Sequence, residues 1–200
     1  MASMTAIAPR IVYLASGAGA LAVATALYVS LVGSQGLFAA SPARSAQETA
    51  AVKKINAAAA ELAASLQSNP GDTESWIMLG RSYATTERHA EAAAAYAKAV
   101  EQRPADAQLL ADYAYQLALV RGRDFAGEPD ALIARALKAD RNNIKALALA
   151  AAVAFERRDY PGAIEYWRRM LPLTSEQSRL GKSVRSSIAS AQSKMEAGKP

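Results

Sequence analysis

The sequence predicts an all-α protein, in which a single N-terminal transmembrane helix precedes an α-solenoid of about three helical hairpins with capping helices at both ends. Three observations support this prediction. A motif of small and aromatic residues fits one hairpin, weaker copies of the motif follow it, and an uncharged stretch near the N-terminus is long enough to cross a bilayer. The chain has 200 residues and is 52% hydrophobic. Much of that content is alanine, which favours closely packed helices.

The hairpin motif covers residues 73–106. It matches the pattern W-x2-L-G-x2-Y, then A-x3-[FY]-x2-A and a final proline, which is typical of the tetratricopeptide repeat. Two of its residues, Gly80 and Ala92, are small where the two helices are expected to cross closely. Such a hairpin cannot bury its apolar face alone, so stacked neighbours are expected. The matching residues are Trp76, Leu79, Gly80, Tyr83, Ala92, Tyr96, Ala99 and Pro104.

Weaker copies of the motif follow the intact one, and amphipathic helices flank the series. The second copy has a longer turn between its helices at 121–129, where glycines and a proline occur. The flanking helices are expected to cap the two ends of the stack. The predicted parts are a linker at 34–45, an N-terminal cap at 46–70, repeats at 73–106, 107–143 and 144–175, and a C-terminal cap at 176–197, so that the repeat domain covers 46–197.

The N-terminal stretch 11–33 contains no charged side chain and would reach roughly 34 Å as a helix, enough to cross a bilayer. Arg10 and the amino terminus are the positive charges ahead of it, which predicts a cytoplasmic segment at 1–10. The prediction is therefore a single-pass protein of the bacterial inner membrane with its repeat domain in the periplasm. A cleaved signal peptide is the alternative, because the small residues at 15–20 lower the hydropathy of the stretch.

The sequence offers little for catalysis. It has no cysteine, and its one histidine, His89, falls near a helix start without a serine, cysteine or acidic residue placed as a partner. Glycine-rich phosphate-binding motifs and clusters of His, Asp and Glu with ligand spacing are missing from the sequence. We therefore expect no enzyme activity, cofactor or metal. An enzyme subunit would need a partner chain to supply the chemistry.

The formal net charge of +5 is unevenly distributed. Residues 107–200 hold 15 Lys and Arg against 10 Asp and Glu, whereas residues 41–106 hold 7 against 8. The basic bias of the C-terminal half is compatible with an acidic peptide partner or a membrane surface. A solvated helix face is the simpler interpretation.

Stacked hairpins offer a binding site, because their first helices line a concave groove. The candidate residues are those that the motif leaves unassigned to packing on these first helices. Their mixture of apolar and charged side chains suits an amphipathic helix better than a nucleic acid or a free carboxylate, so no nucleic-acid partner is expected. The alternative is a groove closed by the chain's own C-terminal cap. The candidates are Glu74, Ile77, Met78, Arg81, Gln108, Asp112, Tyr115, Lys145, Leu149 and Phe155.

A family resemblance is carried by five segments: WIMLGRSY, AEAAAAYAKAV, DAQLLADYAYQLAL, GEPDALIARALKADRNNIKALALAA and DYPGAIEYWRRML. Together they resemble the periplasmic repeat domain of the bacterial cytochrome c maturation system, a family that includes apocytochrome chaperone subunits and nitrite reductase assembly factors. The likeness covers about residues 50–195. Its most specific part is the GEP insertion ahead of the second helix in the second repeat.

The resemblance implies a chaperone without enzyme activity. Such a protein would bind the C-terminal helix of apocytochrome c and deliver it to haem lyase subunits at the inner membrane. Arg81, Tyr115 and Phe155 are the residues predicted to contact the bound helix. A repeat scaffold for a secretion, pilus or other envelope complex is the competing interpretation.

Overall fold

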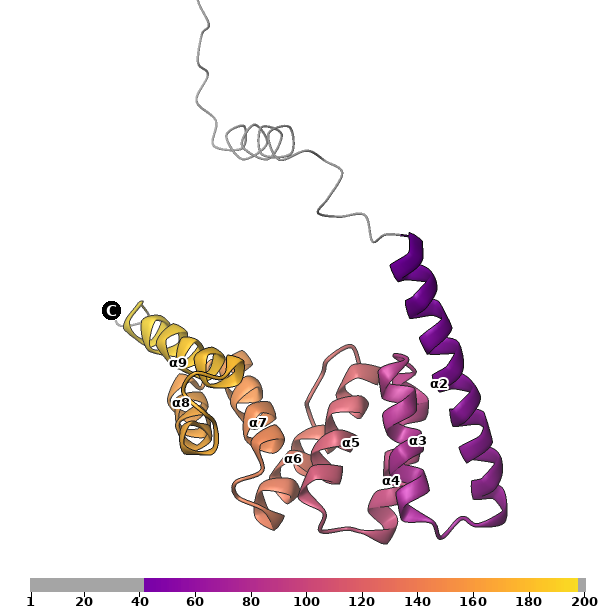
Figure 1. Ribbon diagram of the computed structural model, residues 1–200. Coiled ribbons are helices and arrows are strands. Elements are labelled where there is room, and N and C mark those ends of the chain that lie inside the picture. Colours follow the sequence, from indigo (N-terminus) through magenta and orange to yellow (C-terminus); the bar gives the residue numbers. More distant parts are fainter. Residues whose placement is uncertain (1–41, 198–200) are drawn as a thin grey trace, which may run out of the picture. The chain divides into compact units, whose positions relative to one another are not determined.

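The computed structural model describes residues 42–197, which form eight α helices and one short 3-10 helix (Figure 1). The repeats lie within one compact unit that begins at Thr49. The predicted cytoplasmic segment 1–10 and transmembrane helix 11–33 lie outside the described residues, as does most of the predicted linker. Between residues 42 and 197, no helix combines the length and the hydropathy needed to span a bilayer.

Six of the helices form three hairpins, each made of two consecutive helices that pack on one another. Consecutive hairpins also contact each other, through α4 and α5, through α6 and α7, and between the first helices α5 and α7. The arrangement is all-helical and fits a tetratricopeptide α-solenoid, as the sequence predicts. The hairpins are α3 (Thr73–Thr85) with α4 (His89–Gln102), α5 (Ala107–Val120) with α6 (Glu128–Ala139), and α7 (Ile144–Glu156) with α8 (Tyr160–Met170).

The first hairpin shows why the motif needs a glycine. A Cβ atom built on Gly80 would lie 2.8 Å from Cε1 of Tyr96, because the tyrosine ring of α4 packs directly on the backbone of α3. Tyr96 is 3% exposed, and Ala92 on the same helix is fully buried. The small residues thus allow the close helix crossing that the motif predicts, and the aromatic ring fills the space beside it.

The N-terminal flanking helix α2 (Pro42–Ser68) begins four residues before the predicted cap, in what the sequence suggests is linker. A proline is tolerated at the first helical position, because the amide hydrogen it lacks would have no partner there. Ala59 and Leu66 of α2 are buried and form a small core with Leu79 and Ala95 of the first hairpin. Val52, one of the spaced apolar residues of this helix, is 43% exposed, so only the later turns of α2 cover the hairpin.

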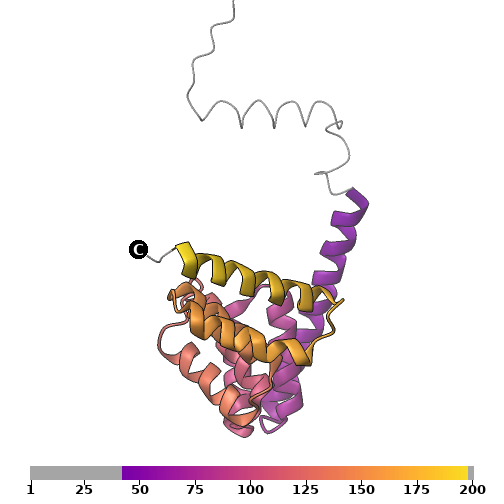
Figure 2. The same cartoon turned by 90° about the vertical axis from the view of Figure 1, so that its left-hand side faces the viewer.

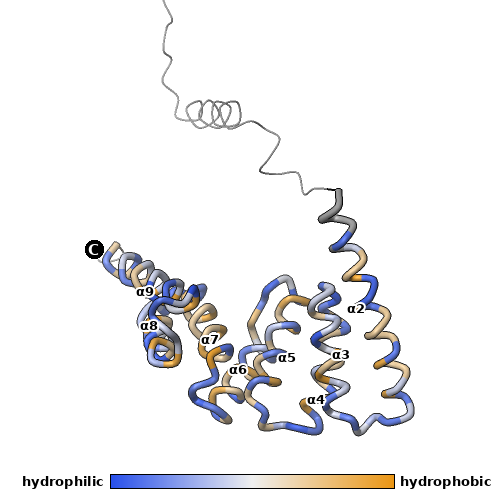
Figure 3. The backbone as a smooth tube through the Cα atoms, in the orientation of Figure 1, coloured by the Kyte–Doolittle hydropathy of each residue, from blue (hydrophilic) through white to orange (hydrophobic). Residues whose placement is uncertain are grey.

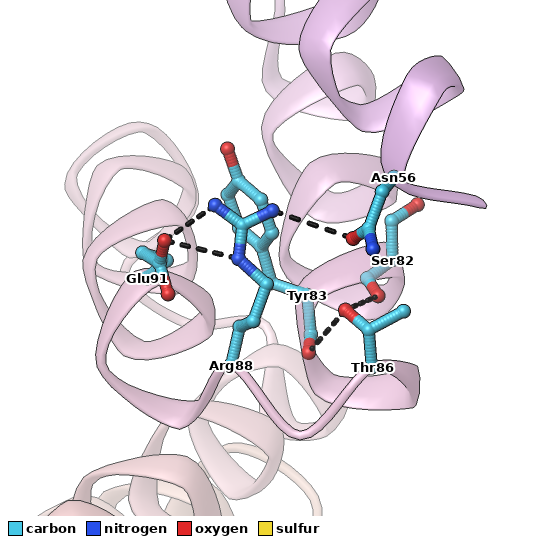
Figure 4. A network of polar contacts seen from close by, with 6 residues as sticks. All are labelled: Asn56, Ser82, Tyr83, Thr86, Arg88 and Glu91. Carbon is cyan, nitrogen blue, oxygen red and sulfur yellow. Dashed lines mark hydrogen bonds and ion pairs between the residues drawn. The ribbon is translucent and has the colours of Figure 1, made fainter. Parts of the chain in front are cut away.

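Arg88, in the turn between α3 and α4, adds a polar contact to α2 (Figure 4). Its guanidinium stacks on the ring of Tyr83 with 4.2 Å between Cζ and the ring centroid. It donates to Oδ1 of Asn56 on α2 at 3.4 Å and to Oε1 of Glu91 on α4 at 3.0 Å. This one side chain therefore links three helices at the N-terminal end of the stack.

The C-terminal flanking helix α9 (Arg179–Ala197) follows the 3-10 turn Leu171–Leu173 and runs beside α8 (Figure 2). Val184 of α9 is buried in a core with Leu147 of α7 and Met170 of α8. Leu180, which the spacing assigns to the same apolar face, is instead 42% exposed, because it lies in the first turn of α9. The helix therefore covers the last hairpin from its second turn onward.

The turns are hydrophilic and the apolar residues lie along the helices, most of all along α5 and α7 (Figure 3). Acidic and amide side chains begin several of the helices: Asp106, Asn143 and Asp159 each accept a hydrogen bond from a backbone N–H three residues on. The long turn of the second repeat covers residues 121–127, and Arg123 and Gly127 in it have positive φ. Of these caps, Asp106 and Asn143 fix where the first helices α5 and α7 begin, and with them the candidate groove.

Candidate functional site

The first helices of the first two repeats enclose a small pocket of about 150 Å³. Five of the ten candidate residues line it, and they come from both helices as the repeat geometry predicts. Arg103, Asp106 and Leu109, which the motif-based selection does not include, complete the lining. The candidates in the pocket are Glu74, Ile77 and Arg81 from α3 and Gln108 and Asp112 from α5.

The pocket has an apolar floor and a charged rim. Ile77 is 7% exposed and Leu109 is 2% exposed, so both belong to the core beneath the surface. Oε1 of Glu74 lies 2.6 Å from a guanidinium nitrogen of Arg103. Arg81 is exposed and forms no ion pair with any residue between 42 and 197. The groove therefore presents one cation that a ligand can use.

A polar chain extends from this pocket to the third repeat. Asp112 is only 8% exposed and forms an ion pair with Lys145 at the start of α7. Gln108 donates to Oδ1 of Asp112 at 3.2 Å and accepts from Nδ2 of Asn143 at 3.4 Å. Nζ of Lys145 also lies 5.3 Å from the ring centroid of Tyr115. Seven candidates, two of them outside the pocket, are thus joined into one continuous surface across α3, α5 and α7.

Tyr96 lies behind this surface. Burial, aided by the nearby Asp112 carboxylate and opposed by Arg81, raises the pKa of Tyr96 to about 12. The phenol is therefore neutral throughout the physiological range. The same ring packs on Gly80, so the packing of the first hairpin and the charges of the groove are adjacent.

The other three candidates lie elsewhere. Met78 is 53% exposed but does not line the pocket, and Leu149 is 9% exposed within the core. Phe155 lies near the end of α7, where its ring centroid is 5.7 Å from that of Trp167 on α8. Lys194 of α9 lies over the same ring at 5.9 Å. Phe155 therefore lines a separate cavity of about 400 Å³ between α7, α8 and α9.

The C-terminal helix leaves the pocket between α3 and α5 open. In the described part of the chain α9 packs on α8 and on the preceding 3-10 turn, and no residue of α9 lines the pocket. On α7 it packs against Leu147 and forms one wall of the Phe155 cavity near the end of that helix. The groove is accordingly accessible along the first two repeats.

One polar pair was not foreseen from the sequence. Nδ1 of His89, the first residue of α4, lies 2.9 Å from Oε1 of Gln116, which is 6% exposed on α5. The two residues are 27 positions apart and belong to different repeats, so no local motif relates them. Among residues 42–197, no cluster of His, Asp and Glu has the geometry of a metal site. The polar groups around the groove thus connect helices and line a surface.

Fold and site define a helical repeat protein with an open groove on its first helices. A family model described as the cytochrome c-type biogenesis protein H TPR domain matches residues 42–180, which is more than half of the chain. The chain therefore belongs to this family, and the resemblance found in the sequence is confirmed.

Several relatives share this part of the chain. The cytochrome c-type biogenesis protein CycH of Pseudomonas aeruginosa is 31% identical over 140 residues, which is 70% of this chain and 34% of the relative. The formate-dependent nitrite reductase complex subunit NrfG of Escherichia coli O157:H7 is 33% identical over 110 residues, 55% of this chain and 56% of the relative. The cytochrome c-type biogenesis protein CcmH of Escherichia coli strain K12 is 34% identical over 131 residues, 63% of this chain and 36% of the relative. The matched part thus spans about one third to just over half of these relatives.

Proposed function

We propose that the chain is a membrane-anchored periplasmic chaperone of cytochrome c biogenesis. In this role it holds the C-terminal helix of an apocytochrome c and delivers it to the haem ligation subunits. The observation that supports the proposal most strongly is the open surface across α3, α5 and α7, with an apolar floor at Ile77 and an unpaired cation at Arg81. Membership in a cytochrome c biogenesis family supports the choice of client.

The chemistry of the surface fits a helix. An amphipathic helix places its apolar residues on one face and charged residues beside them, which matches an apolar floor with a charged rim. A carboxylate on such a helix can pair with Arg81, whereas Glu74 already pairs with Arg103 and Asp112 with Lys145. The client's apolar residues would cover Ile77 and Leu109.

Holding a helix is a useful way to deliver an apocytochrome. Without haem the client stays unfolded, so a site that binds one helical segment leaves the thiols of its C-x-x-C-H motif available for reaction. Attachment of the chaperone and the ligation subunits to one membrane raises their effective concentration, so that modest affinity is sufficient. The proposed role requires no catalytic group on this chain.

Titration with a peptide of the client's C-terminal helix tests the groove. Arg81→Ala and Tyr115→Ala are expected to weaken binding about tenfold each, as removal of an arginine or aromatic contact does at other interfaces. Phe155→Ala tests whether the bound helix extends to the end of α7. Lys98→Ala is the matched control, because Lys98 is an exposed cation on α4 that pairs with Glu101 and lines no part of the groove.

Unchanged affinity in Arg81→Ala, Tyr115→Ala and Phe155→Ala alike would refute the assignment of the groove. Equal losses in the groove variants and in the Lys98 control would indicate nonspecific electrostatic attraction. A protein that binds no apocytochrome peptide, yet is recovered with components of another envelope complex, would favour the scaffold interpretation.

A further inference from the structure

A further hollow lies on α8, the second helix of the third repeat. Its volume is about 620 Å³. It shares no residue with the pocket between α3 and α5 or with the Phe155 cavity, so a ligand here would leave the proposed client groove free. The lining residues are Arg141 from the turn between α6 and α7, and Pro161, Ile164, Glu165, Arg168 and Arg169 from α8.

The hollow carries excess positive charge. Three arginines and one glutamate line it, and none of the four forms an ion pair with a residue between 42 and 197. By contrast, Arg88, Arg103, Arg121 and Arg157 all have carboxylate partners within the described part of the chain. Other arginines between residues 42 and 197, such as Arg81 and Arg123, also lack a carboxylate partner, but in this hollow three such arginines line one surface.

One of the three guanidinium groups is held in place. Arg169 donates from Nη2 to the backbone carbonyl of Arg141, and its Cζ lies 5.8 Å from the ring centroid of Tyr166. Its Nε is buried without a hydrogen-bond partner, alone among the buried side-chain polar atoms between residues 42 and 197. A guanidinium that is already ordered loses less conformational entropy when it binds an anion.

The ordinary role of such residues explains only part of the arrangement. Arg168 and Arg169 lie in the last turn of α8, where cations interact favourably with the helix dipole. Arg141, however, comes from a different element, and Arg168 is exposed and forms no ion pair with a residue between 42 and 197. Three cations from two elements line one hollow, and this arrangement favours a ligand with negative charge.

We infer that this hollow docks an acidic segment of a protein partner while the groove holds the client. Arginine binds carboxylates with a paired, planar geometry, which suits acidic side chains seated in a hollow. Ile164 and Pro161 supply an apolar floor for the carbon atoms of the segment, and Ile164 is 6% exposed. Glu165 stands among the arginines and would repel the dense anionic surface of a membrane, whereas it can accept a hydrogen bond from a peptide. The observations therefore favour a peptide over a lipid surface.

Binding of a defined acidic peptide to the full chain in detergent tests this inference. The probe is a fluorescent, end-capped peptide of Glu and Ala, compared with the same peptide carrying Gln in place of Glu. Arg168→Glu is expected to weaken binding of the acidic peptide on the order of tenfold, since it replaces one exposed ion pair with a repulsion. The variant is suitable because Arg168 is exposed and has no ion-pair partner between residues 42 and 197, so within the fold the change affects chiefly its interaction with the α8 dipole.

Two further variants complete the design. The triple change Arg141→Gln, Arg168→Gln and Arg169→Gln is expected to abolish measurable binding. The matched control removes three cations elsewhere, through Lys53→Gln, Lys54→Gln and Lys98→Gln, and is expected to retain it. Circular dichroism of each variant verifies that the helices are intact. The client peptide is expected to bind Arg168→Glu with unchanged affinity, which separates this surface from the groove.

Four outcomes would overturn the inference. They are equal binding of the Glu and Gln peptides, unchanged binding by Arg168→Glu, equal loss in the control triple variant, and binding that occurs only to anionic phosphatidylglycerol vesicles and depends on the same arginines. The last result would assign the surface to the membrane instead.

Discussion

Replacement of Gly80 by alanine tests how the first hairpin is packed. A Cβ atom there would lie 2.8, 2.9 and 3.0 Å from the Cε1, Cδ1 and Cζ atoms of Tyr96. Favourable carbon contacts lie at about 3.5–4.0 Å, and Tyr96 is only 3% exposed, so its ring cannot move without disturbing the core. We expect this overpacking to cost about 3 kcal/mol. The higher helix propensity of alanine returns about 1 kcal/mol.

The expected net result is a loss of about 2 kcal/mol in the free energy of unfolding. Urea denaturation of the full chain in detergent, followed by circular dichroism, measures this quantity. The double variant isolates the contact: in a Tyr96→Ala background the ring is gone, so Gly80→Ala should stabilise the protein by about 1 kcal/mol. The coupling between the two positions is therefore expected to be about 3 kcal/mol.

Gly71→Ala serves as a control, because a Cβ atom there would meet only Oδ1 of Asn69, at 4.0 Å. It should change the free energy of unfolding by less than about 0.5 kcal/mol. If Gly80→Ala stabilises the otherwise unchanged protein as much as it stabilises Tyr96→Ala, the packing argument is wrong.

Three further changes probe the ionisable groups and the helix ends. The raised pKa of Tyr96 means that its phenol keeps its proton in the folded state above pH 10, whereas in the unfolded state it loses the proton near pH 10. The free energy of unfolding should therefore fall by about 2–3 kcal/mol between pH 10 and pH 12. Denaturation series across that range should show this loss in the unchanged protein and not in Tyr96→Phe. Asp159→Ala removes the carboxylate that accepts a hydrogen bond from the N–H of Gly162 at 3.0 Å, at the start of α8. It should lower the midpoint of urea unfolding by an amount equivalent to about 1 kcal/mol. An unchanged midpoint would show that Asp159 does not cap the helix. Asp112→Ala should lower stability by about 2 kcal/mol because it removes the buried partner of Lys145, and the loss should vanish in a Lys145→Ala background if the pair is the cause.

Much of the fold follows from local sequence patterns. The small and aromatic residues of the first hairpin specify a close helix crossing, and the contact between Gly80 and Tyr96 realises it. In the second repeat, Ile133 and Ala136 have the same three-residue spacing as Tyr96 and Ala99 of the first, and both are buried. The ends of the flanking helices were harder to predict, because Val52 and Leu180 continue the apolar spacing but extend beyond the surface that the hairpins offer.

The candidate groove depends more on tertiary structure. Repeat spacing predicts which residues face the groove, and it places Glu74 and Gln108 in one pocket. It does not predict depth, so Leu149 is buried among its neighbours. Repeat spacing also cannot show where the terminal helix lies. In the structure, α9 forms one wall of a cavity that Phe155 lines and that is separate from the groove. The pair of His89 with Gln116 joins two repeats, and no pattern within one repeat encodes it.

Binding of the full chain to the apocytochrome and to the haem-bound form of one c-type cytochrome, measured side by side, tests the central claim most directly. The proposed chaperone recognises a helix that is available only while the client is unfolded. We therefore expect the apocytochrome to bind, the haem-bound cytochrome to bind at least about a hundredfold more weakly, and Arg81→Ala to reduce the difference. Equal affinity for both forms, or no affinity for the apocytochrome, would contradict the account.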